Sequence, residues 1–264
     1  MNLQLTDKVA FIAGSSRGIG RAIAAALLAE GANIVITGRD EEALNRTHEE
    51  LATTPELRRR ILAITGNFSD PETIEDAFNL TTGRFGQLDH LVANLGTGSG
   101  KPGWQQDEAE WIRLFDANFF SSVRLAQAAI PHLSAGEASE GRSRSILFIS
   151  SIVALEATPA PLPYSAAKAA LTNYAKNLSR LLAPRNIRVN TIAPGNIFFP
   201  GGSWERHLDN RREQVEQMLV TDVPQNRFGT PEEIASLAAY LCSPAAAFAT
   251  GSTYVMDGGQ TRTI

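Results

Sequence analysis

Short runs rich in β-branched residues alternate along this chain with longer segments that carry apolar residues at helical spacing. A parallel β-sheet needs this order, because a crossover helix must follow each strand before the next strand can enter the sheet in the same direction. The predicted strands are 9–13, 33–37, 61–65, 90–93, 145–150, 188–192 and 253–256. The predicted helices are 19–30, 41–53, 71–85, 108–132, 164–182 and 231–241. The pattern predicts an α/β fold, a doubly wound three-layer α/β/α sandwich with a seven-stranded parallel sheet.

Composition agrees with one domain that spans residues 1–264. Hydrophobic residues make up 43% and charged residues 20% of the chain, which suits a sizeable core, and no linker rich in Pro, Gly or Ser divides it. The net charge of −4 speaks against nucleic-acid and anionic-membrane partners. The N-terminus lacks a signal-peptide pattern and no long uncharged apolar run occurs, so we expect a soluble cytoplasmic protein.

A glycine-rich turn follows the first predicted strand and opens an alanine-rich helix. It reads Gly14-Ser15-Ser16-Arg17-Gly18-Ile19-Gly20. Gly14 permits the turn, Gly18 lets backbone approach a pyrophosphate, and Gly20 lets the helix pack closely on the strand. Free N–H groups at the start of a helix bind phosphate, so this turn predicts a dinucleotide site.

A second motif, Tyr164-Ser165-Ala166-Ala167-Lys168, places a phenol and an ammonium four residues apart on a predicted helix. Residues at this spacing share a helix face. A neighbouring cation favours phenolate, so we expect the pKa of Tyr164 to fall below its ordinary value of about 10 and to suit acid–base catalysis.

Together these motifs resemble the short-chain dehydrogenase/reductase family, whose Rossmann-type fold carries the glycine spacing found here; the resemblance spans residues 6–259. It implies that Ser151, Tyr164, Lys168 and Asn118 form the catalytic tetrad. Tyr164 would exchange the proton, Ser151 would hold the carbonyl oxygen, Lys168 would anchor the nicotinamide ribose, and Asn118 would support a water relay. One departure is Ala13, where relatives usually have a threonine that steadies the turn.

The resemblance also implies further cofactor contacts. Asn67 and Phe68 match a pair that flanks the adenine, Asn94 and Gly96 match the end of the fourth strand, and Pro194, Gly195 and Ile197 match a turn beside the nicotinamide. Phe199 stands where many members have threonine, which places a carboxamide hydrogen bond in doubt.

We predict NADP(H) as the cofactor. The second strand is followed by Gly38 and Arg39, whereas NAD-specific enzymes place there an acid that would repel a 2′-phosphate. Arg17 resembles the second basic residue of NADP-using members. The alternative is that Arg39 is only a surface arginine beside Asp40.

The substrate is less constrained. Phe198, Phe199 and Trp204, with Trp104 and Leu95, either line an apolar site or pack a lid formed by about 198–221. The loops add no charged anchor, so a hydrophobic ketone or a 3-oxoacyl thioester fits better than a sugar or a small acid.

We therefore expect a carbonyl reductase, closest to 3-oxoacyl-[acyl-carrier-protein] reductase-like members. The alternatives are the same chemistry in the oxidative direction and a non-catalytic NADP(H)-binding regulator or scaffold. The histidines have no ligand-like spacing, so no catalytic metal is expected. The resemblance of residues 224–259 implies a homo-oligomer, a tetramer or a dimer.

Overall fold

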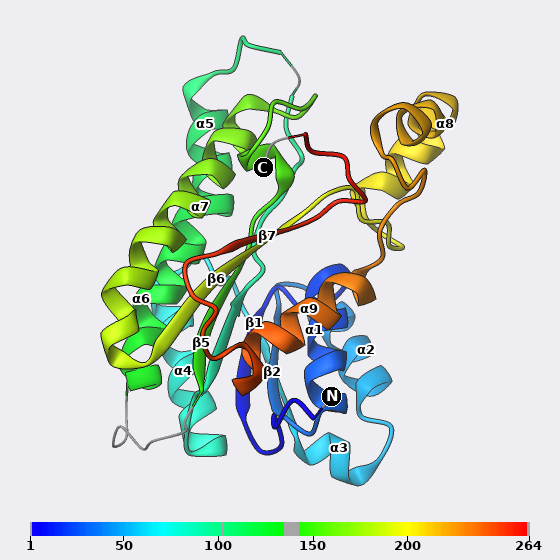
Figure 1. The fold of residues 1–264 in the computed structure, drawn as a ribbon. Helices are drawn as coiled ribbons and strands as arrows, with labels where there is room; N and C mark the ends of the chain where they lie inside the picture. Colours follow the sequence, from blue (N-terminus) through cyan, green and yellow to red (C-terminus); the bar gives the residue numbers. More distant parts are fainter. Residues whose placement is uncertain (1, 102, 135–142, 263–264) are drawn as a thin grey trace.

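The computed structural model of the protein describes residues 2–101, 103–134 and 143–262. Its strands form one parallel sheet in the order β3-β2-β1-β4-β5-β6-β7 (Figure 1). The strands are β1 (Val9–Ala13), β2 (Asn33–Gly38), β3 (Ile61–Thr65), β4 (His90–Ala93), β5 (Arg144–Ile149), β6 (Ile187–Pro194) and β7 (Thr253–Met256). The predicted seven-stranded parallel sheet is thus confirmed.

Helices cover both faces of this sheet. One face carries α1 (Gly18–Ala29), α2 (Glu41–Leu51), α3 (Pro55–Arg59) and α9 (Pro231–Cys242). The other carries α4 (Pro71–Phe85), α5 (Glu108–Phe115), α6 (Ser121–Ser134) and α7 (Leu162–Leu182). Two separate hydrophobic clusters, one on each face, give the predicted three layers. Within the described residues no helix is long and apolar enough to cross a membrane.

The central strands are buried on both faces, which explains their continuous apolar character. All residues of β1, β4, β5 and β6 are buried. Parallel strands that helices cover on both faces have continuous apolar sequences, without alternation of polar and apolar residues. Short apolar runs between helical segments were therefore a dependable signal for the sheet.

Several helix boundaries differ from those predicted. The segment expected as one helix over 108–132 is α5, a π-helical turn at Asp116–Phe120, and then α6. The helix α3 was not predicted, and neither was α8 (Ser203–Asp222), which fills the segment expected to be a lid. Short 3-10 turns lie at Ile152–Ala154, Ala183–Arg185 and Pro244–Ala246.

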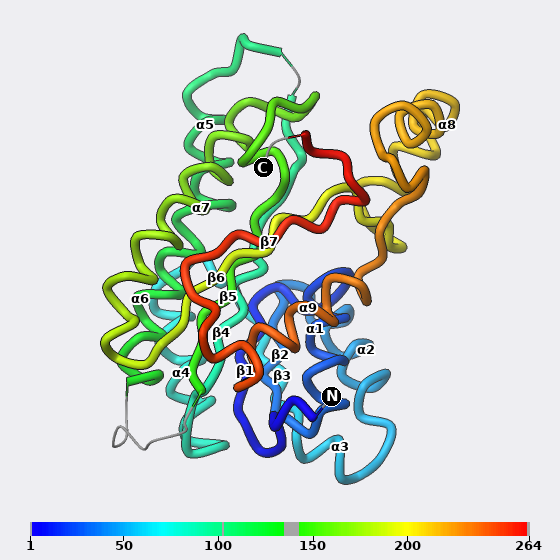
Figure 2. The backbone as a smooth tube through the Cα atoms, in the orientation of Figure 1, coloured from blue at the N-terminus to red at the C-terminus, as the bar shows by residue number. Residues whose placement is uncertain are grey.

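The loops at the carboxyl ends of the strands meet at one edge of the sheet. Sequence order reverses between β1 and β4, and ligands of open α/β sheets bind in the crevice at such a switch point. After β7 the chain runs back along this edge (Figure 2), and at its described end the Arg262 N–H donates to Glu156 Oε2 at 2.7 Å. The predicted loop 96–103 also lies at this edge, with residue 102 outside the described residues.

Candidate active site

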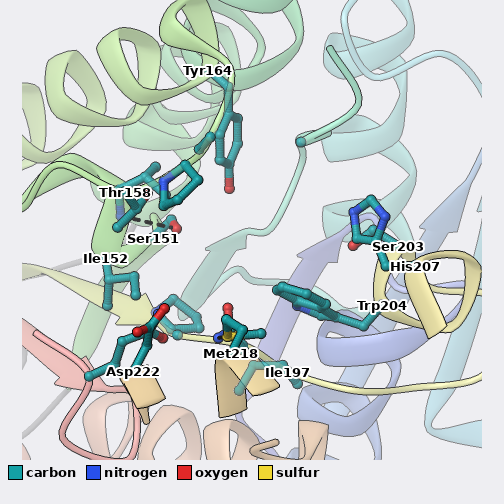
Figure 3. A pocket seen from close by; sticks show the side chains of 18 of the residues that line it. Ser151, Ile152, Thr158, Tyr164, Ile197, Ser203, Trp204, His207, Met218 and Asp222 are labelled. Carbon is teal, nitrogen blue, oxygen red and sulfur yellow. Dashed lines mark hydrogen bonds between the residues drawn. The ribbon is translucent and has the colours of Figure 1, made fainter. Parts of the chain in front are cut away.

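A pocket of about 450 Å³ opens at this edge, which is a usual volume for a small-molecule site. Its walls come from the residues after β5, the start of α7, the turn after β6 and one face of α8. In Figure 3 the hydroxyl of Tyr164 points into the pocket near Ser151, while Trp204 and His207 lie on the opposite side.

Ser151 and Tyr164 meet at the inner end of the pocket. Ser151 follows β5 and caps the 3-10 turn, where its Oγ accepts from the Val153 N–H at 3.4 Å. Tyr164 lies in the first turn of α7. Burial raises the pKa of Tyr164, and its hydrogen bond with Ser151 lowers this pKa in part. The expectation of a lowered pKa was therefore wrong for the protein without ligand, because burial outweighs any nearby positive charge.

Lys168 lies one helical turn after Tyr164 and is buried. Its Nζ donates to the carbonyl oxygen of Ile149 at 2.9 Å. Burial lowers the pKa of Lys168 to about 8, because the ammonium loses contact with water. The spacing on α7 brings the two side chains to one face, as the sequence indicated, and the contact with β5 holds the amine in place.

Asn118 lies in the π-helical turn and is fully buried. Its Oδ1 accepts from the Thr97 N–H at 2.9 Å, and its Nδ2 donates to the carbonyl oxygens of Thr97 and Leu114 at 3.0 and 2.9 Å. The amide is thus occupied in holding the loop after β4. A π turn adds one residue to the helix, and such turns are frequent at functional sites.

Gly96 separates Asn118 from Lys168. A Cβ added to Gly96 would lie 2.6 Å from Asn118 Oδ1 and 3.1 Å from Lys168 Nζ, and the φ of Gly96 is +153°. Asn118 and Lys168, two residues of the predicted tetrad, thus lie on either side of Gly96, and only glycine suits this position.

The glycine loop has the geometry that a nucleotide site needs. Gly14 and Gly18 have φ of +69° and +55°, and a Cβ on Gly20 would overlap the carbonyl oxygen of Gly14. The helix α1 starts at Gly18 without a side-chain cap, so its first N–H groups are not used by a capping side chain. A pyrophosphate fits this cradle, since bulkier residues would fill it and the helix start offers donors.

Thr37 supplies the hydroxyl that Ala13 lacks. Its Oγ1 accepts from the Gly14 N–H at 3.1 Å and donates to the Ile12 carbonyl at 3.3 Å. Ser15 is fully buried beside it, donating to the same carbonyl at 2.7 Å and accepting from the Thr37 N–H at 2.8 Å. Ser15 therefore supports the loop, and its side chain has no free hydrogen to donate to a cofactor.

The other loop residues point elsewhere. The Ser16 carbonyl accepts from Thr47 Oγ1 at 2.8 Å, and the Ser16 side chain lies against Gly38. Ile19 lines the pocket. Arg17 is exposed and donates from Nη1 to the Gly201 carbonyl at 3.0 Å, so it joins the glycine loop to the segment before α8.

Arg39 follows β2 and is exposed. Within the described part of the chain its guanidinium makes no hydrogen bond or ion pair, and Asp40 instead caps α2. Asn67 is exposed after β3, and Phe68 is buried against Phe11 with ring centroids 5.8 Å apart. The structure thus leaves Arg39 free beside the carboxyl end of β2.

The remaining predicted contacts lie around the glycine loop and the pocket. Asn94 Nδ2 donates to the Gly14 carbonyl at 2.9 Å. Pro194, Gly195 and Ile197 line the pocket, and a Cβ on Gly195 would lie 2.7 Å from Asp257 Cβ. Of the cofactor residues expected from sequence, the pocket lining includes Ile19, Tyr164, Pro194, Gly195 and Ile197; the others, Arg39, Asn67 and Phe68 among them, lie outside it.

The aromatic residues expected at the substrate site divide into two groups. Phe199 and Trp204 line the pocket, and the Phe199 ring packs on Gly18. Phe198 packs on Phe228 instead, with ring centroids 5.8 Å apart. Trp104 is 78% exposed, and Leu95 packs against the core.

The sequence interpretation missed the polar wall that α8 contributes. Its pocket-facing residues follow helical spacing and include charged groups: Ser203, Trp204, His207, Arg211, Gln214, Val215, Met218 and Asp222. The expectation of a site without a charged anchor was therefore wrong. Spacing alone could have found this face, but its mixed composition gave no apolar stripe.

Comparison with known proteins finds relatives over nearly the whole chain. The family model described as enoyl-(acyl carrier protein) reductase matches residues 13–261. The 3-oxoacyl-[acyl-carrier-protein] reductase of Vibrio cholerae is 32% identical over 257 residues, which cover 97% of this chain and 98% of the relative.

Solved structures agree in fold. The L-sorbose reductase of Gluconobacter frateurii, solved with NADPH and L-sorbose, has a TM-score of 0.90 at 32% identity and covers 100% of both chains. A 7α-hydroxysteroid dehydrogenase, solved with NADH and 7-oxoglycochenodeoxycholic acid, has a TM-score of 0.87 at 29% identity and covers 99% of this chain and 97% of its own. These similar structures include both nicotinamide nucleotides.

Proposed function

The chain belongs to the short-chain dehydrogenase/reductase family of oxidoreductases, and from this premise we propose that it reduces a ketone to a secondary alcohol with NADPH. The observation that carries the proposal is the pair Ser151 and Tyr164, hydrogen bonded at the inner end of a pocket. Lys168 lies buried one turn behind this pair.

Each of these side chains has a proposed task. Tyr164 gives its proton to the carbonyl oxygen as that oxygen gains negative charge, and the Ser151 hydroxyl donates to the same oxygen. When bound, the nicotinamide supplies the hydride to the carbonyl carbon. Lys168 holds the nicotinamide ribose, and Asn118 fixes the loop after β4 through its three hydrogen bonds and supports the route by which Tyr164 regains a proton.

The raised pKa of Tyr164 keeps its phenol protonated at neutral pH. A phenol that is protonated at neutral pH is ready to donate, whereas alcohol oxidation needs the phenolate as the base. The chemistry is reversible, so the oxidative reaction remains accessible at higher pH.

Arg39 supports the choice of NADP(H). Its guanidinium is exposed after β2 without a partner in the described residues, and a 2′-phosphate is a dianion that such a group pairs well. Gly38 lets the glycine loop pack closely against the end of β2, since a Cβ on it would lie 3.0 Å from Ser16 Cβ. Gly14, Gly18 and the start of α1 would bind the pyrophosphate.

We place the substrate between Tyr164 and α8. In this proposal the chain forms one nucleotide-binding domain, and its segment 198–221 acts as a lid over the substrate. Apolar side chains line much of this space, including Ile152, Ile197 and Met218. They suit a hydrophobic ketone or a 3-oxoacyl compound. The structure describes all of α8, and Val215 is its one buried residue. Few buried contacts therefore hold this helix against the rest of the domain.

The test is NADPH consumption with a panel of hydrophobic ketones and 3-oxoacyl thioesters, using wild type and Tyr164→Phe. We expect the variant to lose turnover by roughly a thousandfold or more while NADPH affinity changes little, because the phenol acts on the substrate oxygen. Tyr174→Phe is the matched control, since that phenol packs on Phe119 and Phe148. A Tyr164→Phe protein with near wild-type turnover would refute the assignment.

Self-association is a further part of the proposal. Large apolar side chains are exposed at Ile112 in α5, at Phe120 in the π-helical turn, at Phe248 before β7 and at Val255 in β7. Exposed apolar side chains that gather on one face mark interfaces. Light scattering should give a mass of two or four chains, and Phe248→Asp should reduce it.

A further inference from the structure

The pocket has one basic end, formed by Arg211 and His207 on α8. Both residues line the pocket, and the Arg211 Nη2 donates to His207 Nδ1 at 3.1 Å. A guanidinium only donates, so the His207 ring is the acceptor in this contact. His207 also packs edge-on against Trp204, with ring centroids 5.4 Å apart.

Arg211 lies where α8 breaks. Its φ and ψ of −156° and 50° are not helical, and the two helical stretches on either side of it meet there. The pocket-facing spacing nevertheless continues from His207 through Arg211 to Val215 and Met218. The break therefore leaves Arg211 on the face that closes the pocket.

The charge of Arg211 has no carboxylate partner within the described residues. Its neighbour Arg212, in contrast, pairs with Glu216 at 3.5 Å. Among the described residues that line the pocket, Asp222 is the one carboxylate; it lies at the other end of α8, and Figure 3 shows it beside Met218 and Ile152, away from His207. Arg206 adds positive charge at the His207 end, since it and Arg211 both contribute to the lowered pKa of His207, of which burial is the largest cause.

An anion is the ligand that such an end would bind. The guanidinium offers paired donors that match the two oxygens of a carboxylate, and the neutral His207 ring adds one N–H. The apolar side chains of Ile152, Ile197 and Met218 line another wall of the same pocket.

We propose that the substrate is a keto acid, whose carboxylate is bound by Arg211 and His207 while its ketone meets Ser151 and Tyr164. This inference rests on the proposed function and narrows its substrate class. Arg211 is then a residue that determines specificity and takes no part in proton transfer.

The experiment compares linear keto acids with their primary amides. The carbonyl and the acid are separated by increasing numbers of methylene groups, and kcat and KM are measured with NADPH for wild type, Arg211→Gln, Arg211→Lys and Arg212→Gln. The quantity compared is the ratio of kcat/KM for each acid to that for its amide. Thermal melting of each variant checks that it is folded.

We expect wild type to prefer the acid at one chain length, mainly through KM. Arg211→Gln should reduce the acid-to-amide ratio roughly 10- to 100-fold, the usual loss for a charge-assisted hydrogen bond. Arg211→Lys should keep part of the preference, and Arg212→Gln should keep all of it.

Two results would overturn the inference: equal use of acids and amides by wild type, or an acid preference that survives Arg211→Gln. If acids and amides are reduced equally well in a Tyr164-dependent manner, the proposed function stands and the inference that the substrate is a keto acid is wrong. If no carbonyl compound is reduced, the proposed function fails and the keto acid fails with it.

Discussion

Lys168 is anchored to the strand that precedes the catalytic serine, because its Nζ donates to the carbonyl oxygen of Ile149 at 2.9 Å. This bond links α7 to the end of β5, two residues before Ser151. The ammonium is buried there, and desolvation lowers the pKa of Lys168 to about 8 from 10.5. Its position therefore has a cost in stability, which should be measurable.

Between pH 8 and 10.5 the unfolded chain keeps the lysine proton that the folded chain has lost. Unfolding then takes up a proton, so the stability of the wild type rises with pH in this window relative to Lys168→Met. The full gain is roughly 3 kcal/mol for a shift of this size. Urea unfolding of both proteins at pH 7 and pH 10 tests it, and a difference between them that is independent of pH would contradict a buried ammonium.

The raised pKa of Tyr164 predicts different pH profiles in the two directions. Alcohol oxidation needs the phenolate, so its kcat/KM should rise about tenfold per pH unit above neutrality, until the pKa in the complex is reached. Ketone reduction uses the phenol and should stay level over the same range. Initial rates from pH 6 to 10 in both directions test this, and a flat oxidative profile would show that Tyr164 is not the base.

Gly96→Ala should damage both stability and activity. The added methyl would lie 2.6 Å from Asn118 Oδ1 and 3.1 Å from Lys168 Nζ, at a φ of +153°. We expect a loss of roughly 2–4 kcal/mol together with a fall in kcat, because overpacking and backbone strain act at one position. Gly83→Ala in α4 is the control, since a Cβ there meets nothing within 4 Å. Equal unfolding free energies for the two variants would argue against this packing.

Arg39→Gln should weaken NADPH binding roughly 10- to 100-fold and leave NADH binding nearly unchanged, because only NADPH carries the 2′-phosphate. Arg46→Gln on α2 is a suitable control, as its exposed guanidinium lies 3.8 Å from Glu42. Fluorescence titration gives both dissociation constants. Similar affinities of the wild type for NADPH and NADH would leave the predicted cofactor preference without support.

Several parts of the candidate site were predictable because they depend on local spacing. Tyr164 and Lys168 share a face of α7 at a separation that any helix of this chain would give them. The turn from Gly14 to Gly20 needs positive φ and close packing, which restrict the sequence itself to glycine. The order of strands and helices followed from periodicity, since a sheet buried on both faces requires apolar runs.

Other parts depend on residues that meet only in the folded chain. Thr37 replaces the missing hydroxyl at Ala13 from a neighbouring strand, and Gly96 fits between Asn118 and Lys168 from three separate elements. The burial that reverses the expected pKa shift of Tyr164 is likewise a sum over distant segments. No local pattern carries this information.

The sequence by itself determined the alternation of strands and helices along the chain, the phosphate loop and the helix that carries Tyr164 and Lys168, because each follows from interactions within a few residues. Only the tertiary structure decided the chemistry of the substrate pocket. There α8 brings His207 to the side opposite Tyr164, and Arg211 is hydrogen bonded to His207. The charge of a pocket is set by which side chains converge in space, and that convergence is a property of the whole fold.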